Sequence, residues 1–196
     1  MTCDILAIHH ILGDPALQFA LRLALASLFA VAAFHKARDL RGFAATLANY
    51  RTLPKRLVPA VAPLLVAIEA GLAVALCATP GSRLAPIAAV VLLGAYSGAI
   101  ALNLVRGRRD IDCGCLGPRH RQPLSEWLLV RNAVTIAAAA TLLVAAGTRP
   151  LHWLDAVSSV TSLAALALLW SAANQLMETW PRVRFVAAPR VDEPVS

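Results

Sequence analysis

The chain has 196 residues, of which 59% are hydrophobic and only 15% are charged, and its mean hydropathy is +0.67. A domain in water needs far more polar surface at this length, so the composition excludes an ordinary soluble protein. The net charge of +7 does not indicate a nucleic-acid partner, because the basic residues lie mostly beside long apolar segments, where lipid headgroups would meet them.

Five apolar blocks are each long enough to cross a bilayer as a helix, which takes about 20 residues. Alanine and leucine dominate them, and no block alternates as a barrel strand does. We therefore predict an all-α bundle of about five transmembrane helices in one integral-membrane domain, residues 1–180, followed by a mobile tail at 181–196. The predicted helices cover residues 16–34, 58–78, 84–104, 127–146 and 154–176.

The segment between the first two predicted helices reads R-D-L-R-G-F-A-A-T-L-A-N-Y-R-T-L-P from residue 38. Leu40, Phe43, Leu47 and Tyr50 recur at helical spacing, and arginines lie on the opposite side. This pattern predicts a short amphipathic helix at the membrane surface that ends near Pro54.

Glu69 lies near the middle of the second predicted helix, at a depth where an ionisable group is costly and usually functional. We expect it to face the interior of the bundle, either protonated or bonded to Asn103 or Arg22 on another helix. A second interpretation of equal weight is a polar contact between helices, which Gly71 would allow to approach closely. Arg22 itself is expected to extend toward the outer headgroups.

The most distinctive loop follows the third predicted helix and reads I-D-C-G-C-L-G at residues 111–117. A disulfide between Cys113 and Cys115 would close a small ring whose geometry is hard to reach, so it would be strained, oxidising and easily exchanged. Gly114 lets the backbone approach that geometry, and Gly117 permits a turn after it. The loop therefore predicts a redox-active pair of thiols.

Charged neighbours have opposing effects on the ionisation of these thiols, since basic groups favour the thiolate and carboxylates oppose it. The basic neighbours are Arg109, Arg119 and His120, and the acidic ones are Asp110 and Asp112. Arg131 and Asn132, at the start of the fourth predicted helix, are expected to close over the loop. Two other interpretations stay open: a pair of exposed thiols without function, and a soft-metal site in which His120 joins both cysteines.

The basic residues also predict an orientation in the membrane. If five helices span, the segments on one side hold fourteen lysines and arginines and the other side holds two. The fourteen are Lys36, Arg38, Arg41, Arg51, Lys55, Arg56, Arg106, Arg108, Arg109, Arg119, Arg121, Arg182, Arg184 and Arg190, and the two are Arg83 and Arg149. The positive-inside rule then predicts an external N-terminus, an internal C-terminus and an internal Cys-Gly-Cys loop.

Taken together, six motifs resemble the MauE family of methylamine utilisation proteins, a membrane family related to the DoxX-like proteins. They are N-Y-R-T-L-P at 49–54, L-V-P at 57–59, E-A-G-L at 69–72, N-L-V-R-G-R at 103–108, I-D-C-G-C-L-G at 111–117 and R-N at 131–132. The resemblance spans roughly residues 16–146, and its one mild departure is Leu116, where the family more often has Phe. It implies a four-helix DoxX-like core with one further helix, in the bacterial inner membrane.

The resemblance further implies a role in making methylamine dehydrogenase, a periplasmic enzyme whose small (beta) subunit carries a tryptophan-derived quinone and many disulfides. Members of the family are held to assist processing, transport or disulfide formation of that subunit, alongside a thioredoxin-like periplasmic partner. On this interpretation Cys113 and Cys115 are the redox pair. The supporting residues are Asp112, Gly114, Gly117, Glu69, Asn103, Arg131 and Asn132. We predict no metal and no bound cofactor, with a membrane quinone as the candidate electron carrier.

Two other functions are compatible with the same residues. One is a membrane chaperone or scaffold in which the thiols are incidental, and the other is a soft-metal transporter in which Glu69 passes the ion inward. Cys77 is expected to serve ordinary helix packing and Cys3 to be an exposed terminal thiol. The predicted orientation also conflicts with the implied client, because it places the Cys-Gly-Cys loop inside while the client lies outside.

Overall fold

A computed structural model of the protein describes residues 12–79, 81–108, 111, 124–144, 147, 152–162, 164, 165 and 168. Throughout these residues the regular structure is helical, and none of them lies in a strand. The helices are α2 (Pro15–Arg38), α3 (Leu40–Asn49), α4 (Val58–Ala78), α5 (Leu84–Val105) and α6 (Glu126–Thr141). The all-α class is confirmed, and residues 153–162 are also helical.

The predicted boundaries hold closely for the two most apolar segments. The helix predicted at 58–78 coincides with α4, and the one at 84–104 differs from α5 by one residue. The first helix runs four residues beyond its predicted end, to Arg38, and the predicted surface helix is α3, which ends at Asn49 rather than near Pro54. The fifth prediction, 154–176, and the tail at 181–196 lie largely or wholly outside the described residues.

The fourth predicted helix, 127–146, ends early, because α6 stops at Thr141 and the chain turns at Leu142. The residues after the turn bond to the start of α2 instead of continuing the helix. Gln18 Nε2 donates to the carbonyl of Val144 at 2.9 Å, and the backbone N–H of Gly147 donates to the carbonyl of Gly13 at 2.7 Å. This contact fixes the end of α6 against the start of α2.

Three of the described helices, α2, α4 and α5, are long and apolar enough to cross a membrane. The 16 residues of α6 rise only about 24 Å, short of a hydrocarbon core of about 30 Å. The chain is therefore a helical integral membrane protein, and for three of the five predicted segments the structure describes a helix that is long and apolar enough to span.

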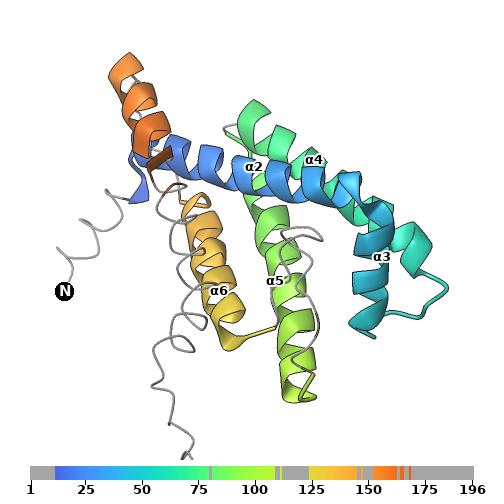
Figure 1. The fold of residues 1–196 in the computed structure, drawn as a ribbon. Helices are drawn as coiled ribbons and strands as arrows, with labels where there is room; N and C mark the ends of the chain where they lie inside the picture. Colours follow the sequence, from blue (N-terminus) through green and yellow to red (C-terminus); the bar gives the residue numbers. More distant parts are fainter. Residues whose placement is uncertain are drawn as a thin grey trace, which may run out of the picture.

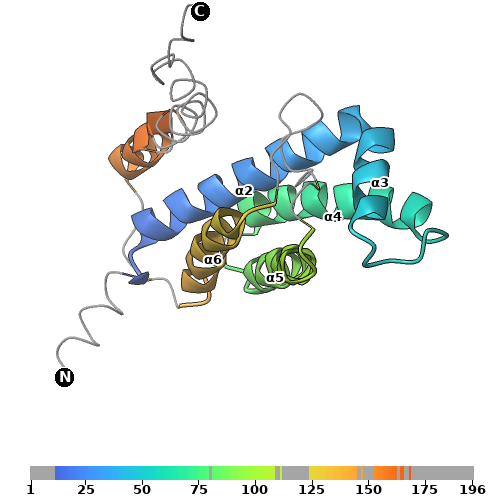
Figure 2. The ribbon, with the colours of Figure 1, turned by 60° about the horizontal axis from the view of Figure 1, so that its bottom comes forward.

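The helices associate as two pairs. α2 packs along α4, and α5 packs along α6. The first pair lies across the second, and α3 turns away from the direction of α2 at the end of that helix (Figures 1 and 2). The first helix begins with a cap from Asp14, whose Oδ1 accepts the N–H of Ala16 at 2.8 Å, and with Pro15 at its first position.

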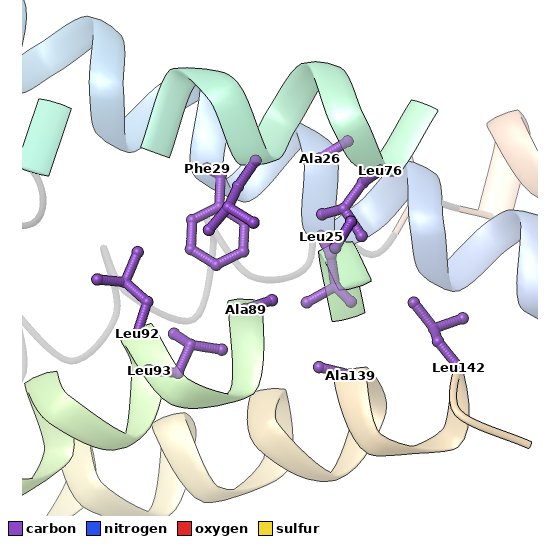
Figure 3. Close-up of a cluster of buried hydrophobic side chains, with 11 residues drawn as sticks. Leu25, Ala26, Phe29, Leu76, Ala89, Leu92, Leu93, Ala139 and Leu142 are labelled. Atoms are coloured by element: carbon purple, nitrogen blue, oxygen red, sulfur yellow. The ribbon is translucent and has the colours of Figure 1, made fainter. Parts of the chain in front are cut away.

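The main core fills the space between the two pairs, and Figure 3 shows its side chains meeting there. Phe29 and Leu76 come from the first pair, and Ala89 and Ala139, fully buried, come from the second. The two alanines allow the helices to approach closely, which in a membrane protein is the main source of helix association. Outside this core many large apolar side chains are exposed, as lipid contact requires.

α5 ends in a Schellman motif that accounts for the segment N-L-V-R-G-R at 103–108. Gly107 has φ +71°, its N–H donates to the carbonyl of Leu104 at 2.9 Å, and the N–H of Arg108 donates to the carbonyl of Asn103 at 3.0 Å. Both carbonyls would otherwise be left without partners at the helix end. The motif directs the chain from α5 into the segment that carries the two cysteines.

Replacing Gly107 with alanine is expected to lower the free energy of unfolding by about 1–2 kcal/mol, because an L side chain is strained at this φ. No atom lies within 4 Å of the position that a Cβ would take, so the effect would come from the backbone alone. Thermal unfolding in detergent micelles measures it. The matched control is Gly94→Ala, inside α5 and equally uncrowded, which should not destabilise the protein.

Candidate functional site

A buried ion pair joins three helices. Lys36 of α2 donates from Nζ to Oε1 of Glu69 on α4, and Tyr96 of α5 donates its hydroxyl to the same oxygen at 2.6 Å. Lys36 Nζ also donates to Tyr96 Oη at 3.4 Å. Glu69 is 1% exposed and Lys36 is 5% exposed, so both charges are withdrawn from solvent. Charges at such a depth survive only when they are paired.

Two aromatic rings complete the surroundings of the lysine. Its Nζ lies 4.8 Å from the ring centre of Tyr96 and 4.9 Å from that of Phe43, which belongs to α3. A cation above the face of a ring is attracted by the negative charge of that face. The ammonium group therefore contacts residues of α3, α4 and α5 at once, and it ties the surface helix to the membrane-spanning ones.

The second oxygen of Glu69 differs from the first. Among the described residues, Oε2 is buried and has no hydrogen-bond partner. Oε1 by contrast accepts from both Lys36 and Tyr96. The carboxylate thus keeps the capacity to accept one more hydrogen bond or a proton.

The predicted burial of Glu69 in the interior is what the structure shows, but the predicted partners, Asn103 and Arg22, are wrong. Arg22 lies on α2, and its Nη1 donates to the carbonyl of Thr79, at the end of α4, at 3.4 Å. Asn103 is fully buried and donates from Nδ2 to the carbonyl of Ala99 at 2.9 Å. Asn103 therefore bonds within its own helix and Arg22 bonds to the end of α4, whereas the carboxylate accepts from Lys36 and Tyr96.

Asn103 also acts on the end of α5. Its Oδ1 accepts a hydrogen bond from Nη1 of Arg108 at 3.1 Å, so side chain and backbone of these two residues are bonded to each other. The buried amide therefore reinforces the Schellman motif and fixes the direction in which the chain leaves the helix.

Asn132 forms the polar contact between α5 and α6. It is buried, and its Nδ2 donates to Oγ of Ser97 at 3.2 Å, next in sequence to Tyr96. Arg131 is half-buried beside it. Since α6 begins at Glu126, both residues lie in its second turn rather than at its start. Whether they close over the cysteine loop stays a prediction, because that loop lies outside the described residues.

Ile111 and Leu124, the two described residues that flank the cysteine segment, are hydrogen-bonded to each other. The N–H of Leu124 donates to the carbonyl of Ile111 at 3.1 Å, and both side chains are buried. They pack in a second apolar cluster, the loop anchor, which consists of Tyr50, Ile100, Ile111, Leu124 and Leu128. Ile111 and Leu124, the described residues on either side of the segment 112–123, are therefore held together on the bundle.

The predicted redox residues themselves, Cys113 and Cys115, lie outside the described residues, as do Asp112, Gly114, Gly117, His120 and Cys3. Cys77 is described and is exposed near the end of α4. The expectation that it packs between helices of this chain is wrong, because its side chain points out of the bundle at the last turn of α4.

Sequence reasoning missed Lys36 and Tyr96 as partners of Glu69. Lys36 was grouped with the headgroup-facing residues because it follows the first apolar block. A usable signal was present, since a buried carboxylate needs a cation and Lys36 lies only two residues past that block. Tyr96 carried no signal of its own, because a tyrosine within an apolar helix is compatible with simple packing.

The arrangement also bears on metal transport. Glu69 Oε1 is occupied by an ammonium group, and a positive charge at that place repels a passing cation. No cluster of three metal-binding side chains occurs among the described residues. The position of Lys36 thus argues against an ion path through Glu69.

Comparison with known sequences identifies relatives over most of the chain. The family model described as "Methylamine utilisation protein MauE" matches residues 14–145. A protein named Methylamine utilization protein MauE from Paracoccus denitrificans is 41% identical over 126 residues, which cover 64% of this chain and 68% of that protein. No solved structure matches the chain.

Proteins of the same name from other bacteria match over a longer range. The one from Paracoccus versutus is 38% identical over 169 residues, or 85% of this chain and 90% of that protein. The one from Methylophilus methylotrophus is 35% identical over 179 residues, or 88% and 91%. The matches to these relatives are therefore longer than the range 14–145 that the family model covers.

Proposed function

The chain belongs to the MauE family of methylamine utilisation proteins, and we propose on that basis that it is a membrane maturation factor for methylamine dehydrogenase. It would assist processing, transport or disulfide formation of the small subunit through Cys113 and Cys115. A thioredoxin-like periplasmic protein is the proposed partner. The bacterial inner membrane is the proposed location.

The observation that carries this proposal is the loop anchor. Ile111 lies two residues before Cys113 and is buried, and its carbonyl accepts the N–H of Leu124. The pair of thiols is therefore tethered within a few residues of a fixed point on the bundle, rather than on a free tail. A dithiol that exchanges with a partner needs such a fixed base, because a partner can then dock on the bundle and meet the thiols in one orientation.

The proposed reaction is a thiol–disulfide exchange. A thiolate of the client attacks the Cys113–Cys115 disulfide, a mixed disulfide forms, and a second client thiolate displaces it. The client gains one disulfide and this pair becomes two thiols. Reoxidation of the pair removes two electrons and two protons, for which a membrane quinone is the proposed acceptor.

Replacing either Cys113 or Cys115 with serine is expected to leave the protein at normal levels in the membrane but to deplete correctly bridged client subunit, because one thiol cannot complete the exchange. Non-reducing electrophoresis of the client measures this. Cys77→Ser is the matched control, since it removes an exposed thiol at another place and should leave the client unchanged.

Two outcomes would contradict the redox function. Normal client disulfides in the Cys113→Ser, Cys115→Ser double variant would favour the scaffold function instead. Equal loss in Cys77→Ser would show that any thiol matters and that the pair is not special.

The orientation in the membrane is a separate part of the proposal. Lys36 is buried, so it no longer counts among the headgroup-facing residues, but thirteen basic residues remain on its side against two. The charge bias therefore still predicts an external N-terminus, an internal C-terminus and internal cysteines, whereas direct exchange with a periplasmic client requires Cys113 and Cys115 outside. Labelling both cysteines in intact cells with a membrane-impermeant thiol reagent decides between the two, and labelling that succeeds only after permeabilisation would contradict direct exchange with the client.

A further inference from the structure

Five basic side chains lie on α3 and on the segments just before and after it. We call this group the basic end of the bundle, and it consists of Arg38, Arg41, Arg51, Lys55 and Arg56. All five are exposed, and within the described part of the chain none forms an ion pair with a carboxylate. The nearest carboxylate in sequence, Asp39, is engaged as the cap of α3, where Oδ1 accepts the N–H of Gly42 at 2.9 Å.

α3 is a short amphipathic helix of ten residues, the kind of helix that lies in a membrane surface. It turns away from the direction of α2 and packs against α2 and α4 (Figures 1 and 2). Its Phe43 faces inward onto Lys36, and the arginines remain outside. Exposed apolar side chains, Leu40 and Leu57, lie beside the basic residues in sequence. An apolar surface bordered by cations is the pattern that a phospholipid matches with its acyl chains and its headgroup.

Arg51 supplies an independent observation. It follows the last turn of α3 and has φ +50°, the only positive φ of a non-glycine residue in the described part of the chain. Glycine is the usual residue at this place after a helix, because a side chain is strained there. The fold needs only the backbone, whose N–H donates to the carbonyl of Ala48 at 3.2 Å. A strained arginine with an exposed side chain points to a role for its charge.

We propose that the basic end binds the phosphate headgroup of an anionic phospholipid and that Arg51 contacts that phosphate. The neighbouring Tyr50 is part of the loop anchor, together with Ile111 and Leu124. A lipid bound at Arg51 would therefore hold the base of the cysteine segment at the membrane surface. This inference does not depend on the redox function.

The test compares the thermal unfolding of the purified full chain in micelles supplemented with phosphatidylglycerol or with phosphatidylcholine. The wild-type midpoint is expected to be higher in phosphatidylglycerol by about 2–4 °C. Arg51→Gly should be at least as stable as wild type in phosphatidylcholine, because glycine relieves the strain, but it should lose most of the phosphatidylglycerol increment. If Arg51 served the fold alone, its replacement would change the unfolding midpoint by the same amount in both lipids.

Three comparisons make the result decisive. Arg83→Gln removes the same charge from an exposed site before α5 and should keep the increment. Arg51→Asn, which tolerates the same backbone, should behave as Arg51→Gly does. The proposal is overturned if Arg51→Gly keeps the full increment, if Arg83→Gln loses as much, or if inorganic phosphate alone reproduces the effect, which would indicate a small-anion site.

Discussion

Replacing Glu69 with alanine is expected to destabilise the protein by about 3–5 kcal/mol, because Lys36 would remain buried without a counter-ion. Tyr96 would lose the acceptor of its 2.6 Å hydrogen bond in the same step. Both losses fall on the junction of α2, α4 and α5, so the helices should separate there first. Denaturant unfolding in micelles, together with limited proteolysis in native membranes, measures the change.

The double variant Lys36→Met, Glu69→Leu is the control for this prediction. Replacing both members of a buried ion pair with apolar residues of similar volume is often neutral or stabilising, so most of the lost stability should return. A single Glu69→Ala variant with wild-type stability would show that the pair contributes nothing to the fold. If the double variant is stable but no longer supports client maturation, the pair has a function beyond packing, and the unpartnered Oε2 of Glu69 is its expected site.

Sequence patterns predicted the positions of the membrane helices well, because an apolar run of this length has few alternatives to a helix. They located Glu69 in the interior for the same reason. They failed on its partner, because α2 continues four residues past its apolar block and carries Lys36 into the bundle. How far a helix continues into polar sequence depends on what packs against it, and here the partners come from three other helices.

The end of α6 shows the same limit. The sequence remains apolar through residue 146, so hydropathy predicts helix there, yet the chain turns at Leu142. The decisive contacts are the bonds to Gln18 and Gly13, which are more than 120 residues away in the chain. By contrast, the turn after α5 is encoded locally, because Gly107 follows the helix at the place where a left-handed residue is required.

The loop anchor was not predicted at all, although two of its residues belong to recognised motifs. Tyr50 belongs to N-Y-R-T-L-P and Ile111 begins I-D-C-G-C-L-G, and the two residues are 61 positions apart in the chain. The structure brings both into one apolar cluster with Leu124. The first motif therefore has a structural reason to occur with the second: it supplies a side chain that holds the base of the cysteine segment.

Replacing Leu124 with alanine is accordingly expected to cost about 2–5 kcal/mol at the loop anchor, since the side chain is only 2% exposed and its loss leaves a cavity. The backbone hydrogen bond to Ile111 should weaken with it, because the apolar contacts exclude water from that bond. Cys113 and Cys115 would then react faster with a thiol reagent in micelles, and less correctly bridged client would form in cells.

Leu142→Ala separates this effect from a general loss of stability. Leu142 is equally buried but belongs to the main core between the helix pairs (Figure 3), so its replacement should cost a similar free energy without changing the reactivity of the two cysteines. Equal acceleration in both variants would mean that the cysteines respond to the stability of the whole bundle. Acceleration in Leu124→Ala alone would mean that the dithiol is positioned by its anchor, so that a partner meets a prepared site rather than a free loop.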